Sequence, residues 1–215
     1  METENNLITK TFLWMFLGLL TTAVTSYLTY STGLLETILT RGSFRMILLL
    51  ELVVVIAFSA LSKKLPAMAV AVLYFLYAAI SGITFSTIFY VFELNSIVLL
   101  FIVSALLFGG LALYGYKTDK DLSSVGRILM ATLLVGLIVS IINMFIGNTL
   151  VDIILDWVIL FVFFGVTAYD MNKIKGGFYD YYDADKAHIY AAMDLYLDFI
   201  NIFIRILSLF GDRKK

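Results

Sequence analysis

Seven long apolar stretches follow one another along this chain, and each is long enough to form a helix that crosses a lipid bilayer. A helix rises about 1.5 Å per residue, so about 20 apolar residues cover a hydrocarbon core of roughly 30 Å. The stretches cover residues 7–30, 44–62, 67–92, 96–116, 128–146, 150–174 and 187–210. Because the links between them are short and polar, we predict an all-α membrane protein with seven transmembrane helices in a single polytopic domain, residues 1–215.

The composition excludes most soluble functions. The chain is 61% hydrophobic and 14% charged, whereas about a quarter of the residues of soluble proteins are charged. The net charge of −1 gives no support for binding to nucleic acid. The absence of cysteine excludes disulfide bonds and thiolate metal sites. We expect a monomer that is surrounded by the lipid bilayer and holds no tightly bound cofactor.

Lysine and arginine gather in alternate links, which predicts the orientation of the chain. The links after the second, fourth and sixth stretches contain Lys63, Lys64, Lys117, Lys120, Arg127, Lys173, Lys175 and Lys186. Since such residues favour the cytoplasmic side, the N-terminus is predicted to be cytoplasmic. Arg41 and Arg45 in the first link are a minor exception. A spanning final helix puts the basic tail at 213–215 outside, whereas a re-entrant helix keeps it inside; the length of the stretch favours spanning.

The final stretch differs from the others because its charged and polar side chains recur at helical spacing. Its polar residues are Asp194, Asp198, Asn201, Arg205 and Ser208. At about 100° per residue they fall on one narrow stripe of a helix. A charged stripe is costly against lipid, so we expect it to face protein or a water-filled path, with the rest of the chain around a central last helix. An amphipathic helix on the membrane surface is the alternative, but the wide apolar arc and the few basic residues disfavour it.

Two aspartates near the predicted cytoplasmic side are candidates for a proton sensor. Asp170 lies near the end of the sixth stretch, and Asp198 lies on the seventh after a short link. Carboxylates in contact share one proton, with one pKa strongly raised, and they also offer the oxygen ligands that Ca²⁺ prefers, which allows transient metal contacts. The alternative is that Asp170 only touches interfacial water near Lys173. Asp194 is expected to be solvated, and His188 to be exposed at the interface.

Three more acidic residues lie within or beside the spans. Glu51, in the middle of the second stretch, is expected to pair with Arg205 or a hydroxyl group, or to line a cation path. Asp152 and Asp156 are one turn apart at the predicted outer end of the sixth stretch. We favour a solvated helix end for these two residues over an acidic vestibule that attracts cations.

Two segments resemble the paired signatures of the Bax-inhibitor family, the transmembrane Bax inhibitor motif proteins. They are AYDMNKIK at 168–175 and LYLDFINIFIRIL at 195–207, and SGITFS at 81–86 is similar to the third span of that family. The resemblance implies seven helices, six of them wrapped around a central C-terminal helix, and a pH-sensitive Ca²⁺ leak through the membrane. It also implies that Asp170 and Asp198, by their YD and LDFIN contexts, are the aspartate pair that senses protons.

The resemblance extends to Glu51, which matches an acidic residue in the second span of the family. Bacterial members can carry an arginine about three turns later, near the aspartate pair, that latches the closed state. This chain has Ser62 at that position, followed by Lys63 and Lys64. A lysine offers a flexible point charge in place of a planar guanidinium, so we expect a different latch and a different pH midpoint. A bacterial-type member is expected in the inner cell membrane.

Other functions make use of the same acidic residues. Intramembrane aspartyl proteases also have two aspartates in adjacent spans, but their second aspartate follows Gly-x-Gly and precedes Pro-Ala-Leu. Here Leu197 precedes Asp198, and the sole proline is Pro66, so we expect no enzyme. A cation/proton exchanger and a non-conducting interaction or stress-regulatory protein remain the alternatives to a Ca²⁺ leak.

Overall fold

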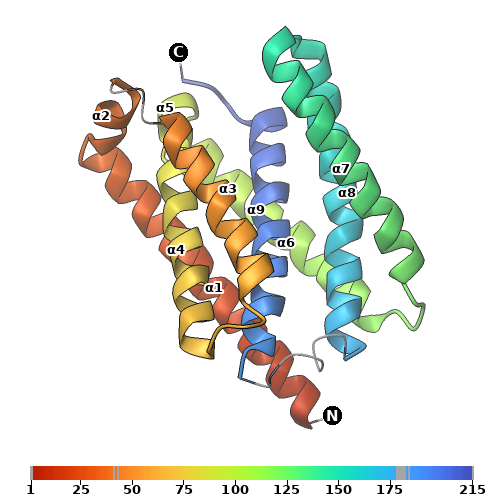
Figure 1. Ribbon diagram of the computed structural model, residues 1–215. Coiled ribbons are helices and arrows are strands. Elements are labelled where there is room, and N and C mark those ends of the chain that lie inside the picture. Colours follow the sequence, from red (N-terminus) through yellow and green to blue (C-terminus); the bar gives the residue numbers. More distant parts are fainter. Residues whose placement is uncertain (1, 41, 43, 178–182, 184, 215) are drawn as a thin grey trace. The chain divides into compact units, whose positions relative to one another are not determined.

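A computed structural model describes residues 2–40, 42, 44–177, 183 and 185–214, and the elements in this part are α-helices (Figure 1). They are α1 (Glu2–Ser31), α2 (Leu34–Thr40), α3 (Phe44–Leu61), α4 (Ala67–Phe85), α5 (Ile88–Val91), α6 (Leu94–Lys117), α7 (Ser123–Ile146), α8 (Thr149–Lys175) and α9 (Ala187–Phe210). The prediction of an all-α protein is confirmed for these residues. The third predicted stretch is divided into α4 and α5, α7 begins earlier than predicted, and the first link contains α2. Arg41 in that link lies outside the described residues.

In the described part of the chain, five helices are long and apolar enough to cross a membrane. They are Asn6–Ser31, Ala67–Val91, Leu94–Lys117, Ser123–Ile146 and Thr149–Lys175, and Met46–Leu61 is a shorter apolar helix. The 24-residue α9 falls outside this group and carries Asp194, Asp198 and Arg205. The polytopic class is therefore confirmed, while the arrangement of seven spans stays a prediction.

The described residues form two compact units. The first unit comprises those within 1–92, 179–196 and 214–215, and the second unit those within 93–178 and 197–213. Helix α9 contributes its first ten residues (187–196) to the first unit and residues 197–210 to the second. The prediction of a single domain is not tested by this division.

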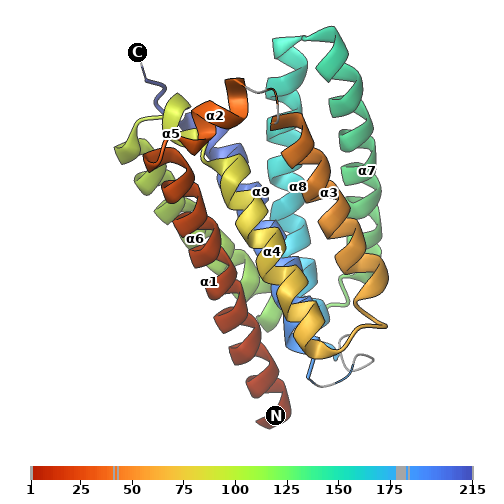
Figure 2. The same ribbon diagram turned by 60° about the vertical axis from the view of Figure 1, so that its left-hand side comes forward.

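In the first unit, α1 and α4 lie side by side because small residues let their backbones approach (Figure 2). A Cβ atom added to Gly82 would lie 2.6 Å from the carbonyl oxygen of Thr22. Hydroxyl groups then bridge the helices: Thr22 Oγ1 donates to the carbonyl oxygen of Ala78 at 2.9 Å and lies 2.7 Å from the hydroxyl of Tyr196 on α9. Tyr196 is fully buried, so this contact fixes the first part of α9 within the unit.

The two ends of the α9 segment contact the two ends of the α4–α5 segment in the first unit. Lys186 Nζ donates to the carbonyl oxygen of Leu65 at 3.2 Å, just before α4 begins. After α9, the amide of Lys214 donates to the carbonyl oxygen of Val91 at 2.9 Å, where α5 ends. The chain between Lys186 and Lys214 thus covers the distance of the 25-residue span Ala67–Val91. Whether α9 spans the membrane or is re-entrant stays a prediction.

In the second unit, α8 packs against α6 and α7. The approach of α6 to α8 is very close, since a Cβ atom added to Gly115 would lie 2.2 Å from the carbonyl oxygen of Ala168. The α7–α8 turn follows from its sequence: Gly147 ends α7 with φ of 72°, and Asn148 caps α8 by accepting from the amide of Leu150 at 3.0 Å. These contacts place α8 so that Asp156 and Asp170 are buried within the unit, while Asp152 near the start of the helix is exposed.

Candidate functional site

Asp170 and Asp198 are both buried in the second unit, on α8 and α9 respectively. Their exposed fractions are 3% and 2%. Lys173 Nζ lies 2.7 Å from Asp170 Oδ1 and 5.1 Å from the centre of the Tyr169 ring, so the carboxylate is paired with a cation one helical turn away. Asp170 is therefore shielded from solvent and paired with Lys173, so its surroundings are more than interfacial water. The shared proton between Asp170 and Asp198 stays a prediction.

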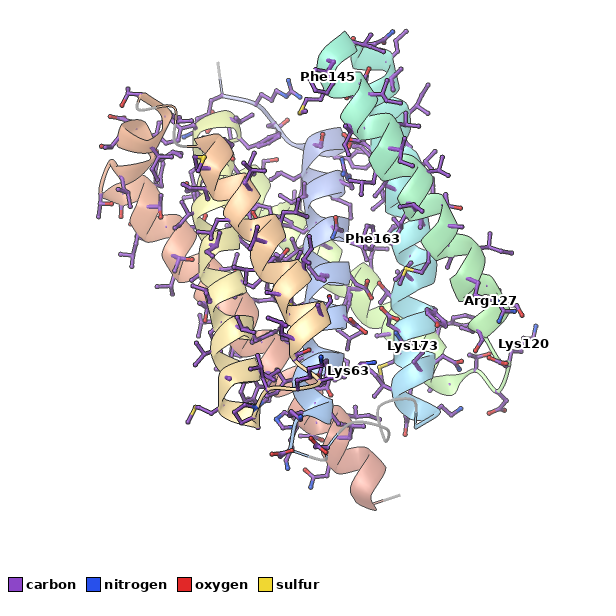
Figure 3. The ribbon with its side chains drawn as sticks, viewed as in Figure 1. Lys63, Lys120, Arg127, Phe145, Phe163 and Lys173 are labelled. Atoms are coloured by element: carbon purple, nitrogen blue, oxygen red, sulfur yellow. The ribbon has the colours of Figure 1, made fainter. Side chains whose placement is uncertain are left out.

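Three cations of the α6–α8 part of the second unit lie toward one end of it, whereas Arg205 of α9 pairs with Asp156 in the other half of α8. Lys120, Arg127 and Lys173 lie toward the lower end of the view in Figure 3, whereas Phe145 lies at the opposite end. In the loop at that lower end, the hydroxyl and amide of Ser123 hydrogen-bond to Asp121 and hold the pKa of its carboxyl below the usual value. The separation of charged and apolar ends is the pattern on which the predicted orientation depends.

At the other end of α8, Asp156 forms a buried ion pair with α9. Arg205 Nη1 donates to Asp156 Oδ1, and Ser208 Oγ donates to Asp156 Oδ2 at 2.6 Å. Asp156 is only 8% exposed, so the prediction that it lies at a solvated helix end is wrong. The physical reason is that the polar stripe of α9 provides partners for it. Asp152, one turn earlier, is exposed as predicted and accepts from Asn143 Nδ2 at 2.6 Å.

The sequence contained a signal for this ion pair. Asp156 follows the start of α8 at Thr149 by about 10 Å along the helix, and Arg205 precedes the end of α9 at Phe210 by about 8 Å. Charges at matching depths on antiparallel neighbours are natural partners. The sequence alone suggested Glu51 as a partner of Arg205 and did not indicate Asp156.

Glu51, in the first unit, accepts hydrogen bonds from two hydroxyl groups. Ser81 Oγ donates to Glu51 Oε1 at 2.6 Å, and Thr84 Oγ1 donates to Glu51 Oε2 at 2.8 Å. Both donors belong to the SGITFS segment at 81–86. This segment therefore supplies the hydrogen bonds to the half-buried Glu51 of α3.

Removing one of these donors should destabilise the protein. We expect Thr84→Val to lower the free energy of unfolding by about 1.5–3 kcal/mol, because a hydrogen bond to a charged group is lost without a change of shape. Thr132→Val is the matched control, since Thr132 Oγ1 only bonds the carbonyl oxygen of Ile128 within its own helix at 2.9 Å. Thermal unfolding in detergent measures both variants, and equal losses would show that Glu51 gains nothing from Thr84.

The predicted latch positions lie at the turn after α3. Ser62 is buried, whereas Lys63, which is labelled in Figure 3, and Lys64 are exposed. The substitution of a latch arginine by either lysine stays a prediction.

The remaining predicted residues lie on α9. Asp194 is half-buried, and Asn201 Nδ2 donates to the carbonyl oxygen of Leu197 in its own helix at 2.8 Å. His188 was expected to be exposed, but it is half-buried with its ring centre 5.3 Å from that of Trp14. The reason is that α1 extends beside the start of α9 and covers it.

Apolar helices of membrane-spanning length with buried acidic side chains define a multi-pass membrane protein. The family described as "Inhibitor of apoptosis-promoting Bax1" matches residues 4–215. The chain is 38% identical to the inner membrane protein YbhL of Escherichia coli strain K12 over 208 residues, which cover 94% of this chain and 89% of that protein. It is 32% identical to an uncharacterized protein of Borreliella burgdorferi over 217 residues (98% and 94% covered) and 32% identical to one of Deinococcus radiodurans over 209 residues (95% and 89% covered). The chain therefore belongs to the Bax-inhibitor family.

Proposed function

We propose that this protein is a pH-sensitive Ca²⁺ leak channel of the bacterial inner membrane, gated by a proton that Asp170 and Asp198 share. The observation that supports it most is that both carboxylates are at most 3% exposed and belong to the same unit of a membrane protein. An acid inside a bilayer costs about 2.5–3.5 kcal/mol or more when it is unpaired. Such residues are rarely retained without a function, and carboxylates are the groups that handle protons and cations.

The gate works through the packing of α8 against the second part of α9. A proton shared between the two carboxylates draws the helices together, and loss or gain of that proton changes their attraction and shifts α9 between two arrangements. Ca²⁺ is the transported ion. It takes six to eight oxygen ligands, so a carboxylate pair holds it only in passing. In the described part of the chain, no group of three or more His, Asp or Glu side chains is placed to hold a metal.

The full arrangement that we propose has seven spanning helices, with α9 in the centre and six others around it. The burial of most α9 side chains supports this arrangement. Those buried include Ile189, Tyr190, Ala191, Ala192, Met193, Leu195, Phe199, Ile202, Phe203, Ile206 and Leu207. The N-terminus is cytoplasmic, and the basic tail after α9 is outside.

Ca²⁺ uptake into liposomes that contain the purified protein tests this function. We expect uptake that depends on pH between about 5 and 9, the range in which shared carboxyl protons and histidines titrate. Asp170→Asn and Asp198→Asn should each abolish the pH dependence or move its midpoint. Asp152→Asn is the matched control, because this exposed residue of α8 lies away from the pair and should leave the midpoint unchanged.

Three results would contradict parts of the proposal. If neither aspartate variant alters the flux, the protein is still a leak, but the two aspartates are not its proton sensor. No flux at any pH would exclude the leak and favour a non-conducting interaction protein. A fixed ratio of protons moved to Ca²⁺ moved, measured with a pH-sensitive dye inside the liposomes, would instead establish a cation/proton exchanger.

A further inference from the structure

The ion pair of Asp156 with Arg205 lies far from the aspartate pair of the proposed gate. Asp156 and Asp170 are 14 residues apart on α8 (170 − 156), which is about 21 Å along the helix. Asp156 lies about 10 Å along α8 from its first residue, Thr149, within an apolar helix of membrane-spanning length. The pair is therefore a second charged position at the opposite end of the second unit.

Both oxygens of the Asp156 carboxylate are occupied by groups of α9. Arg205 binds one oxygen, and Ser208 donates to the other. The guanidinium itself is held less completely. Its side chain is 28% exposed, and its Nε atom is buried without a hydrogen-bond partner among the described residues. A guanidinium has five donor hydrogens. Because Arg205 contacts Asp156 through Nη1, few hydrogen bonds are lost when the guanidinium moves away from the carboxylate.

We infer that Arg205 is a tethered cation that competes with the transported cation for the Asp156 carboxylate, and that this competition limits cation passage at this end of the protein. The inference rests on the proposed leak function. A carboxylate in a low-dielectric region attracts cations strongly, and rings or single charges of this kind set the selectivity of ion paths. While the Arg205 guanidinium binds the Asp156 carboxylate, the pair has no net charge and attracts a passing cation only weakly. When Arg205 leaves, the site becomes a cation contact.

This role differs from that of a purely structural ion pair in the sign of its mutational effects. Loss of Arg205 leaves an uncompensated negative charge that attracts cations, whereas loss of Asp156 leaves a positive charge that repels them. A structural pair has no such asymmetry, since removal of either partner breaks the same contact between α8 and α9. The direction of change in Ca²⁺ flux thus separates the two roles.

The test measures initial Ca²⁺ uptake into liposomes at several Ca²⁺ concentrations, at a pH where the wild type conducts. We expect Arg205→Gln to raise uptake at low Ca²⁺ by about tenfold or more, with a lower half-saturating concentration, because a fixed charge changes local cation concentration by at least that factor. Asp156→Asn should lower uptake by a similar factor. The double variant Asp156→Asn with Arg205→Gln should return toward the wild type.

Each outcome decides the inference. Changes of the same sign in the two single variants, or no change in half-saturation, would overturn the competition and leave the leak intact. Absence of flux in the wild type would overturn the proposed function, and the competition with it. If Arg205→Gln fails to fold, as judged by size-exclusion chromatography and circular dichroism, Ser208→Ala replaces it. This variant keeps both charges but removes a competing donor, so it should still lower the half-saturating concentration, and an unchanged value would overturn the inference.

Discussion

Replacing Gly115 with alanine is expected to lower the free energy of unfolding by about 1–3 kcal/mol or more, because the added methyl group has no space. It would lie 2.2 Å from the carbonyl oxygen of Ala168 on α8. A backbone carbonyl cannot rotate away as a flexible side chain can, so α6 and α8 must move apart. That movement also disturbs the part of α8 next to Asp170, and we expect the pH dependence of flux to broaden or shift.

The same helix provides the matched controls for this substitution. An added Cβ at Gly109 or Gly110 meets nothing within 4 Å. Gly109→Ala and Gly110→Ala should therefore keep or raise stability, by up to about 1 kcal/mol for the better helix former. Thermal unfolding of the three variants in detergent makes the comparison. A Gly115→Ala protein as stable as the other two would show that α6 and α8 are not in such close contact.

The positions of the helices could be predicted from the sequence because the length of an apolar run is a local property. The ends of α6, α8 and α9 in the structure fall within three residues of the predicted ones. The break between α4 and α5 was missed because it depends on side-chain hydroxyls. Ser86 Oγ donates to the carbonyl oxygen of Ile83 at 2.6 Å, and Thr87 Oγ1 to that of Thr84 at 2.9 Å. Such bonds compete with the helix backbone, and a continuous apolar pattern does not reveal them.

The candidate site was predictable in its residue types but not in its pairings. An acidic residue in an apolar run stands out in any sequence, as Glu51, Asp170 and Asp198 do. Which group meets which acid depends on helix rotation and depth. The sequence left Arg205 as a possible partner of Glu51, and only the packing of α8 with α9 shows that it binds Asp156. The position of Gly115 against α8 likewise depends on packing between helices distant in the sequence.

Breaking the Asp156–Arg205 pair is expected to have the second large effect on stability. Arg205→Met alone leaves a buried carboxylate without its cation, and Asp156→Leu alone leaves a guanidinium without its anion. Removal of one partner of a buried pair costs about 3–5 kcal/mol, and the partial exposure of Arg205 favours the lower end, about 3 kcal/mol. The double variant Asp156→Leu with Arg205→Met should recover most of the loss, because apolar side chains suit the space between two membrane helices.

Unfolding measurements on the two single variants and the double variant form a cycle that isolates the coupling energy of the pair. Losses that simply add in the double variant would show that Asp156 and Arg205 do not stabilise one another. This cycle is independent of ion flux and therefore complements the liposome experiment. If the two residues are coupled in stability, but both single substitutions change Ca²⁺ uptake in the same direction, the pair only holds α8 to α9. A coupled pair with opposite effects on uptake both holds the helices together and controls the passage of cations between them.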